Sequence, residues 1–393
     1  MPSRRWLPGR DLALDLGTAS TLIHQQGRGV VLDEPSVVAL AADSDEVLAA
    51  GRAAKEMLGR TPGSMRSVRP LRGGVIHDPD VAERMLRVFA DTVGVSSVLR
   101  PRVVVCVPST VSPLERRAVE DVALRVGARR VYVVEEPVVA AIGAGLPLTG
   151  SDASTVVDIG GGSTDAAILA LGAVVASRSV RVGGESMDEA IAAHVEQHYS
   201  LLLGERSAEH IKIEAGSAFP LGQERRTRVR GRDLVTGLPR TVEIGSSEVR
   251  RALDAPVRAV VDLVRSLLDA SPPELVGDVL SRGVVLTGGG ALLRGLDARL
   301  EHGSGAHARR RRAAARRRRR GPVRRRLRHA RARPRRRPEV LTSCAGVWPC
   351  SSRSPCSCCS STWPGADRPC PLGRGERLRP DAAGDEHRRG RPP

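Results

Sequence analysis

The sequence predicts an α/β fold made of two related halves, and two observations carry this prediction. Short apolar runs alternate with amphipathic helical patterns over residues 10–300, as in folds that pack helices against a sheet. One plan, an apolar run, an acid, glycine and then hydroxyl residues, occurs twice, in "LALDLGTASTLI" at 12–23 and in "TVVDIGGGSTDAAIL" at 155–169. The two acids, Asp15 and Asp158, lie 143 residues apart, which indicates related halves.

Strands of the first half are predicted where apolar residues alternate or form short runs. Residues 11–24 are expected to form two strands around a glycine turn, and Pro35 should restrict the next strand region, 29–40, to an edge or an end. The apolar runs at 101–109 and 130–137 are expected to be buried strands.

Helices of the first half are predicted from helical spacing over 82–94 and 112–127, with a third beginning near residue 138. The second of these helices should start with a capping box, in which Ser112 is the cap and Glu115 reaches back to it. Its predicted apolar face consists of Leu114, Ala118, Val119 and Val122.

The second half repeats this alternation of strands and helices. A strand–turn–strand unit is expected over 154–171, a hairpin over 233–244, and a strand, a triple-glycine turn and a helix over 283–300. Helical patterns cover residues 183–199, 206–218, 246–253 and 255–270.

Charge and cysteine are concentrated at the carboxyl end of the chain. The net charge of +18 would by itself suggest a nucleic-acid partner. Residues 301–393, however, hold 26 arginines, no lysine and seven acids, so residues 1–300 carry a net charge of only −1. Six of the seven cysteines also lie after residue 300. We therefore expect a cytoplasmic body that is not built on disulfides and has no nucleic-acid partner.

The two acid–glycine turns predict a site for phosphate groups. Glycine lets backbone amides approach an anion closely, and successive N–H groups form an anion-binding concavity. An acid beside such a turn would repel phosphate unless a cation lies between them, so Asp15 and Asp158 suggest Mg²⁺ held largely through water. No G-x-x-x-x-G-K-[ST] P-loop is present, and Asp165 stands where a dinucleotide fingerprint needs glycine.

These motifs resemble those of a known family. "DLALDLGTASTL", "VVDIGGGSTDAAI" and "VVLTGGGALLRG" look like the two phosphate motifs and the adenosine motif of the actin, Hsp70 and sugar-kinase superfamily. "GRAAKEMLGRTPGSMRSVRPLRGGVIHD", "RPRVVVCVPSTVSPLERRAVEDVA", "EEPVVAAIGAGLPL" and "GRDLVTGLPRTVEI" are similar to the bacterial MreB/Mbl family. The resemblance runs in collinear order over about residues 10–300 and implies an actin-like, ribonuclease H-like, duplicated two-domain ATPase fold.

The resemblance also implies ATP and Mg²⁺ as ligands and assigns residues to them. Glu136, or alternatively Glu135, would orient the attacking water, and Asp15 and Asp158 would lie near the Mg²⁺. The implied nucleotide contacts are Asp15, Gly17, Thr18 and Ala19; Asp158, Gly160, Gly161, Gly162, Ser163 and Thr164; Glu209, Lys212 and Glu214; and Gly288, Gly289 and Gly290.

The implied function is an ATPase that polymerises into filaments on the inner face of the cell membrane and works with the cell-wall elongation machinery. Val98 and Leu99, followed by two arginines, would be an apolar membrane-binding tip, although an ordinary surface loop explains them equally well. An Hsp70-like ATPase or a small-molecule kinase on the same fold, or a non-functional truncated paralogue, remain alternatives.

The resemblance implies an N-terminal tail at 1–9, domain I at 10–148 with subdomain IB near 31–68, and domain II at 149–300 with subdomain IIB near 181–255. Residues 301–393 show no apolar periodicity and are expected to be a disordered tail unlike the family. We hypothesise a frameshift near residues 301–308, which translation of the other two reading frames would test. A basic arm for nucleic acid or anionic lipid is the competing interpretation.

Overall fold

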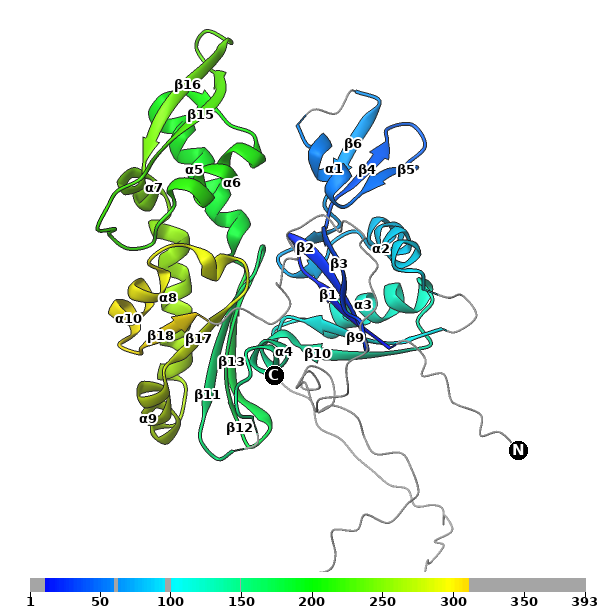
Figure 1. Ribbon diagram of the computed structural model, residues 1–393, viewed down its shortest axis with the longest axis vertical. Helices are drawn as coiled ribbons and strands as arrows, with labels where there is room; N and C mark the ends of the chain where they lie inside the picture. The colour runs from blue at the N-terminus through cyan, green and yellow to red at the C-terminus, as the bar shows by residue number, and fades with distance from the viewer. Residues whose placement is uncertain (1–10, 60–62, 96–99, 149, 311–393) are drawn as a thin grey trace, which may run out of the picture. The chain divides into compact units, whose positions relative to one another are not determined.

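The computed structural model describes residues 11–59, 63–95, 100–148 and 150–310. Two five-stranded mixed sheets form its framework, in the orders β10-β9-β1-β2-β3 and β13-β12-β11-β17-β18 (Figure 1). The strands of the first are β1 (Leu12–Leu16), β2 (Ser20–Gln25), β3 (Gly29–Pro35), β9 (Arg102–Val107) and β10 (Arg130–Glu135). Those of the second are β11 (Ser154–Ile159), β12 (Thr164–Ala170), β13 (Ala173–Val180), β17 (Val284–Thr287) and β18 (Ala308–Arg310).

The two sheets have the same topology. In each, three consecutive strands form an antiparallel meander. One later strand then adds in parallel to the first strand of that meander, and a second later strand adds in parallel to the one before it. Thus β1 corresponds to β11, β9 to β17 and β10 to β18. The predicted duplication of an α/β unit is therefore confirmed by strand pairing.

The helices follow the sequence patterns except for α1 and α9, which were not predicted. Those of the first half are α1 (Arg52–Met57), α2 (Pro79–Val93), α3 (Pro113–Arg125) and α4 (Glu136–Gly143). Those of the second half are α5 (Gly184–Tyr199), α6 (Glu205–Ala215), α7 (Ser246–Ala252), α8 (Asp254–Asp269), α9 (Pro273–Arg282), the 3₁₀ turn η1 (Gly290–Leu292) and α10 (Leu296–Ser304). The predicted capping box of α3 is present, with Ser112 and Glu115 bonded reciprocally.

Short strands decorate both halves. The first half carries a sheet of β4 (Val38–Ala41), β5 (Val47–Ala50) and β6 (Met65–Val68), and the small hairpin of β7 (Leu71–Arg72) and β8 (Val75–Ile76). The second half carries a sheet of β14 (Leu201–Leu202), β15 (Arg226–Asp233) and β16 (Pro239–Gly245).

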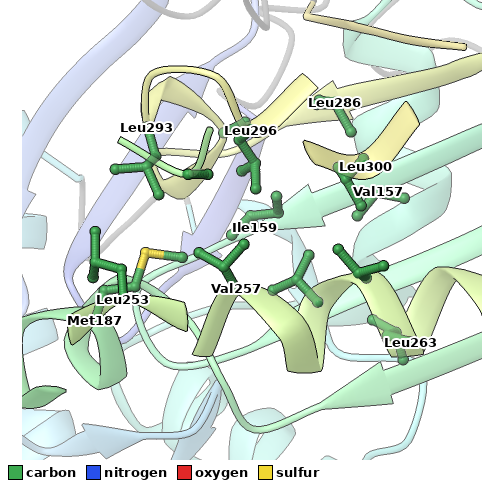
Figure 2. Close-up of a cluster of buried hydrophobic side chains, with 14 of the residues drawn as sticks. Val157, Ile159, Met187, Leu253, Val257, Leu263, Leu286, Leu293, Leu296 and Leu300 are labelled. Atoms are coloured by element: carbon green, nitrogen blue, oxygen red, sulfur yellow. The ribbon is translucent and has the colours of Figure 1, made fainter. Parts of the chain in front are cut away.

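Each large sheet has its own hydrophobic core. In the second half, Val157 and Ile159 of β11 and Leu286 of β17 pack against the apolar side of α8, including Val257 (Figure 2). The other face of the same sheet is covered by α4, since Ala141 packs with residues of β11 and β12. Helix α4 therefore leads from the end of β10 onto a face of the second sheet.

Two sequence predictions about burial were wrong. Leu114 was expected on the buried face of α3, but it is 79% exposed because it lies in the first turn, whereas Val119 and Val122 are buried as predicted. The run at 130–137 was expected to be a fully buried strand. Residues 130–135 form β10, an edge strand with one neighbour, and no residue of this strand is fully buried. Residues 136 and 137 already belong to α4.

The expected end of the ordered sequence at residue 300 was also wrong. Helix α10 continues to Ser304, and β18 then pairs in parallel with β17. Ala306 and Ala308 are buried at the edge of the sheet that β18 forms. Two small apolar residues spaced two apart are therefore enough to add this strand. The predicted membrane tip, Val98 and Leu99, lies outside the described residues, as does the rest of the predicted tail.

Candidate functional site

The two glycine turns occupy equivalent places in the two sheets. The first turn, residues 17–19, joins β1 to β2, and the second turn, residues 160–163, joins β11 to β12. In both strands the acid is the last residue but one, so a single residue separates Asp15 and Asp158 from their turns. The spacing read from the sequence thus places both acids at the same end of equivalent strands.

The glycines of the second turn are required by close packing against the first turn. A Cβ atom built on Gly161 would lie 2.6 Å from the Cβ of Ala19. One built on Gly162 would lie 2.5 Å from Thr18 Oγ1 and 2.8 Å from the backbone nitrogen of Gly73. The two turns therefore meet face to face, and the glycine backbone of the second turn lies against Ala19 and Thr18 of the first.

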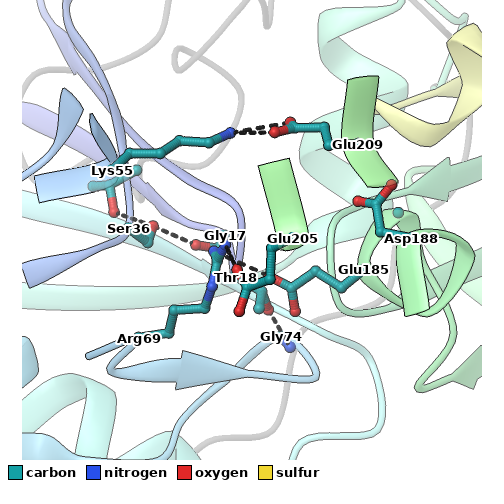
Figure 3. Close-up of polar contacts among 12 residues, drawn as sticks. Gly17, Thr18, Ser36, Lys55, Arg69, Gly74, Glu185, Asp188, Glu205 and Glu209 are labelled. Carbon is teal, nitrogen blue, oxygen red and sulfur yellow. Dashed lines mark hydrogen bonds and ion pairs between the residues drawn. The ribbon is translucent and has the colours of Figure 1, made fainter. Parts of the chain in front are cut away.

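The first turn is held by hydroxyl groups. The Ser36 hydroxyl donates to the carbonyl of Gly17 at 2.6 Å and lies 2.9 Å from the hydroxyl of Thr21. Thr18 Oγ1 accepts a hydrogen bond from the backbone N–H of Gly74 at 2.8 Å (Figure 3). Ser36 was not among the predicted site residues, and its only sequence signal is a serine directly after the proline that ends β3.

The second turn is held by the start of α5. The backbone N–H of Gly184 donates to the carbonyl of Gly160 at 3.0 Å, and that of Glu185 donates to Gly161 at 2.8 Å. A Cβ on Gly183 would collide with both carbonyls, at 2.8 Å and 2.6 Å. The predicted helix start "GGES" thus has a second role in the site, which helical periodicity alone did not reveal.

Carboxylates converge between the turns, and their charges disfavour one another. Asp15 and Asp158 keep part of their surface exposed, yet burial raises the pKa of each to about 6, and the charge of Asp15 adds to the shift at Asp158. Burial, followed by the charges of Asp165, Asp158 and Asp15, raises the pKa of Glu136 well above its usual value. Such a cluster is suited to a cation that would neutralise it.

The donor set fits Mg²⁺ bound mainly through water. Within the described ranges, no group of three or more histidine, cysteine or acidic side chains is close enough to form a ready-made metal cage. Mg²⁺ commonly keeps several waters and takes only one or two carboxylates together with phosphate oxygens. Asp15 and Asp158, beside turns that expose backbone N–H groups, match that preference.

The triple glycine after β17 packs against the end of β11. Gly288 has a φ of +82°, and a Cβ there would lie 2.5 Å from Asp158 Oδ1. Gly290 is equally restricted by Ile159, whereas a Cβ on Gly289 would meet nothing within 4 Å. The glycine loop predicted on the adenine side is therefore placed beside Asp158, with one glycine facing open space.

The three α6 residues predicted to contact nucleotide occupy different environments. Glu209 receives both contacts of the Lys55 ammonium, at 2.7 and 3.0 Å (Figure 3). Lys212 donates to the carbonyl of Gly184 at 2.6 Å and to Asp188 at 2.7 Å. Glu214 is exposed. Lys55, which sequence reasoning missed, thus joins Glu209 and Lys212 as a charged group bordering the site.

Arg69 forms further ion pairs between the two halves, as Lys55 and Glu209 do. Arg69 contacts Glu205 at 2.8 Å and Glu185 at 3.3 Å (Figure 3). Because Glu185 also donates its backbone N–H to the second turn, this arginine is linked to the site through one residue. The side chains of these pairs are partly exposed to solvent, and such pairs contribute little stability, at most about 1 kcal/mol each.

Comparison with known proteins agrees with this geometry. The model of the MreB/Mbl protein family matches residues 9–313, a range that extends past residue 300. The chain is 49% identical over 307 residues to the cell shape-determining protein MreB of Escherichia coli, covering 77% of this chain and 88% of that protein. It is 46% identical over 289 residues to the cell shape-determining protein Mbl of Bacillus subtilis, covering 73% and 87%.

Solved structures give the same result. MreB5 of Spiroplasma citri bound to ADP has a TM-score of 0.73 and 36% identity, with 78% of this chain and 93% of that chain covered. The same protein bound to AMPPNP has a TM-score of 0.73 and 37% identity, with 76% and 90% covered. The MamK double helical filament, at 23% identity, a TM-score of 0.64 and coverage of 76% and 94%, supports the fold alone. Within the described residues, no helix has both the length and the apolar character that a membrane span needs.

Proposed function

Because the chain belongs to the MreB/Mbl family of actin-like proteins, we propose that it binds ATP, polymerises into membrane-associated filaments and directs cell-wall synthesis and cell shape. The observation that carries this proposal is the pair of acid–glycine turns that meet face to face. Two equivalent turns on duplicated sheets provide backbone N–H groups from both sides for a chain of phosphates.

The nucleotide is proposed to lie between the two turns. Thr18, Ser163 and Thr164 supply hydroxyl groups, and Gly160 to Gly162 supply backbone approach, for the phosphates. ATP fits because related MreB5 binds ADP and AMPPNP. Asp15 and Asp158 would hold Mg²⁺ through water, and the ion when bound would supply positive charge that offsets both the phosphates and the carboxylates.

Glu136 is proposed to orient the water that attacks the terminal phosphate and to take its proton. It begins α4 directly after β10 and lies in the field of three aspartates. A raised pKa makes a carboxylate a stronger base, because the best base has a pKa near the working pH. Glu135, one residue earlier at the end of β10, is the alternative.

The remaining assignments follow from the family and from the sequence. Glu209, Lys212 and Glu214 are proposed on the ribose and adenine side with Gly288 to Gly290. Val98 and Leu99 are proposed as the contact with the inner face of the membrane, which would make the protein cytoplasmic and peripheral. Self-association is the family property that we expect first, and the cell-wall elongation machinery is the proposed partner of the filaments.

Co-sedimentation and flotation test this function. The full chain is incubated with Mg²⁺-ATP, Mg²⁺-ADP or no nucleotide, and then centrifuged with and without vesicles of anionic phospholipid. We expect ATP-dependent pelleting, and flotation with vesicles that the double substitution Val98→Ser, Leu99→Ser abolishes while pelleting persists. A soluble protein that phosphorylates a sugar with ATP and never pellets would contradict the proposal in favour of a kinase.

A further inference from the structure

Two histidines lie one helical turn apart on α5, near the opposite end of this helix from the residues that hold the second glycine turn. His194 and His198 occupy positions i and i+4, and the helix ends at Tyr199. Residues with this spacing share one side of a helix. The two imidazole rings are stacked, with centroids 4.0 Å apart and planes 24° from parallel. Two histidines spaced in this way on one helix face are a known arrangement for binding a single metal ion.

Each of the two rings has one nitrogen bonded to a fixed acceptor. His194 Nε2 lies 3.1 Å from Glu248 Oε1 of α7, and His198 Nδ1 lies 3.0 Å from the carbonyl oxygen of His194. An ionised carboxylate and a backbone carbonyl only accept hydrogen bonds, so each of these ring nitrogens must carry the hydrogen. In a neutral imidazole the other nitrogen then carries a lone pair. The lone pairs are therefore on Nδ1 of His194 and on Nε2 of His198.

The carboxylate that orients His194 is itself held in place. Tyr199 donates its hydroxyl hydrogen to Glu248 Oε2 at 2.9 Å, so both oxygens of this carboxylate have a donor. The side chains of His194 and Glu248 are only 12% and 18% exposed. Metal-binding histidines almost always donate their second ring N–H to a carboxylate or a backbone carbonyl, because that bond fixes the tautomer and the ring orientation. Both histidines of α5 have a partner of this kind.

The place of the two rings on the helix favours a cation. They lie in the last two turns of α5, where the negative end of the helix dipole stabilises positive charge. The nitrogens bound to one tetrahedral Zn²⁺ lie about 3.4 Å apart, which is close to the separation of the two rings. Because no three histidine, cysteine or acidic side chains form a ready-made cage in the described part of the chain, water would complete the coordination.

We propose that His194 and His198 form a binding site for a divalent transition-metal ion, with Glu248 and the His194 carbonyl as the groups that orient the two rings. Imidazole nitrogen suits Zn²⁺, Cu²⁺ and Ni²⁺, whereas Mg²⁺ prefers oxygen ligands, so this site differs in chemistry from the acids Asp15 and Asp158. The bound ion would stabilise the end of the helix whose start supports the second glycine turn. The inference does not rest on nucleotide binding.

The competing interpretation is a polar network that needs no metal. In it, His194, Glu248 and Tyr199 simply link α5 to α7 through their hydrogen bonds. This network accounts for His194 but gives no role to His198, whose hydrogen bond goes to a backbone carbonyl of its own helix and whose ring stacks on His194. The two interpretations therefore differ most in the expected effect of replacing His198.

The test titrates Zn²⁺ into the full chain without nucleotide, after treatment with a chelator and alkylation of the reactive cysteines with iodoacetamide. Alkylation is needed because the chain has seven cysteines, and thiolates are zinc ligands. Calorimetry gives the stoichiometry and the Kd for the wild type and for His198→Ala, Glu248→Gln and, as the matched control, His210→Ala. His210 is an exposed histidine on the neighbouring helix α6.

We expect the alkylated wild type to bind a Zn²⁺ ion that depends on both histidines. His198→Ala should weaken this binding about 100-fold or more because it removes a ligand, and Glu248→Gln about 10- to 100-fold because it removes a group that orients a ligand. His210→Ala should leave the Kd within about twofold of wild type. Zn²⁺ should also raise the unfolding temperature of the wild type and of His210→Ala, but not that of His198→Ala.

Pulsed electron paramagnetic resonance of bound Cu²⁺ counts the coordinated imidazoles, and we expect two in the wild type and one in His198→Ala. A purely structural role of the histidines would not produce this change. Because His198 is exposed, its replacement keeps the test available if Glu248→Gln does not fold.

The inference is overturned if the alkylated wild type does not bind Zn²⁺, if His198→Ala binds it as tightly as the wild type, or if His210→Ala loses as much affinity as His198→Ala. Binding that alkylation abolishes would assign the ion to the cysteines and would overturn it as well. None of these measurements involves nucleotide, so their outcome is separate from that of the co-sedimentation test of the proposed function.

Discussion

The first and second glycine turns lie at equivalent places in the two sheets, but different hydrogen bonds hold them. The first turn is fixed by side-chain hydroxyls, chiefly Ser36, which is fully buried. The second turn is fixed by backbone N–H groups at the start of α5. Opposite the acid, the first hairpin carries Leu22 and the second carries Asp165. The two halves therefore share the glycine-turn backbone that we propose binds phosphate, and they differ in the residues that surround it.

This difference indicates a division of roles. The first turn needs one glycine, Gly17, whereas the second has three consecutive glycines, two of which face the first turn. The second hairpin also contributes two of the three aspartates whose charges act on Glu136. We infer that the first hairpin mainly binds and that the second both binds and shapes the reactive side of the site.

The largest effect is expected from a side chain in the second turn. In Gly162→Val the new Cβ would meet Thr18 Oγ1 and the backbone of Gly73, and overpacking against backbone cannot be relieved by a rotamer change. We expect AMPPNP affinity to fall more than about 100-fold, or about 3 kcal/mol.

The same titration is made with Gly17→Val, whose Cβ has a single close contact, with the carbonyl oxygen of Ser20 at 2.8 Å. It is also made with Gly222→Ala, whose Cβ has nothing within 4 Å. Gly17→Val should lower AMPPNP affinity less than Gly162→Val does, and Gly222→Ala should leave it unchanged. An equal loss in the two turns would show that the second turn is no more restricted than the first.

The next effect is the pH dependence of stability in the absence of nucleotide. Asp15, Asp158 and Asp165 have folded-state pKa values of about 6, above the usual 3.8. Their contribution to the free energy of unfolding is therefore complete below pH 4 and is lost as the pH rises through 6. A shift of this size corresponds to at most about 3 kcal/mol per group.

Urea unfolding at pH 5 and pH 7.5 measures this loss. Asp158→Asn should reduce the difference between the two pH values, because it removes one of the groups. Asp233→Asn is the matched control, since hydrogen bonds from Thr236 and Val235 together with Arg240 hold the pKa of that buried acid below its usual value. The proposed cause would be contradicted if the wild-type protein were more stable at pH 7.5 than at pH 5, and by the same amount as the Asp158→Asn variant.

Replacing Asp15 or Asp158, the acids proposed to hold Mg²⁺, compares the contributions of the two hairpins to metal binding. Asp15→Asn and Asp158→Asn should each weaken Mg²⁺-dependent nucleotide binding about 10- to 100-fold, as for groups that hold a metal through water. The loss should be greater for Asp15→Asn, because Leu22 opposite it cannot replace a carboxylate, whereas Asp165 remains opposite position 158. Calorimetric titration of ADP with and without Mg²⁺ shows which substitution weakens binding more. A greater loss in Asp158→Asn than in Asp15→Asn would refute the idea that Asp165 compensates for the missing carboxylate.

The smallest effect is expected from the support of the first turn. Ser36→Ala removes the donor to the Gly17 carbonyl and leaves Thr21 without its buried partner. We expect a loss of about 1–2 kcal/mol of unfolding free energy and only a few-fold change in nucleotide affinity. Ser151→Ala, an exposed serine with one local contact, is the control for thermal denaturation. A large loss of affinity would mean that Ser36 contacts the nucleotide directly.

Much of the fold was predictable from local patterns. Short apolar runs gave the strands, the capping box of Ser112 and Glu115 fixed the start of α3, and the paired motifs at Asp15 and Asp158 indicated the duplication. Helix α1 was missed because a helix of six residues is too short to show periodicity. Helix α9 was missed because its proline start and its internal Gly277 are typical of turns. Leu114 was misplaced since spacing identifies a face of a helix but not how far the core extends along it.

The sequence by itself determined the duplicated α/β plan, the two glycine turns and the acids before them, because these depend on backbone conformation and periodicity within short segments. Only the tertiary structure decided which groups meet across segments. It brought Gly161 against Ala19, Lys55 to Glu209 and Ser109 to Asp165. Contacts between residues so distant in the chain depend on strand register and on how helices cover the sheets, and no local pattern encodes them. Asp165 is the clearest case, since its burial opposite Asp158 exists only in the assembled hairpin.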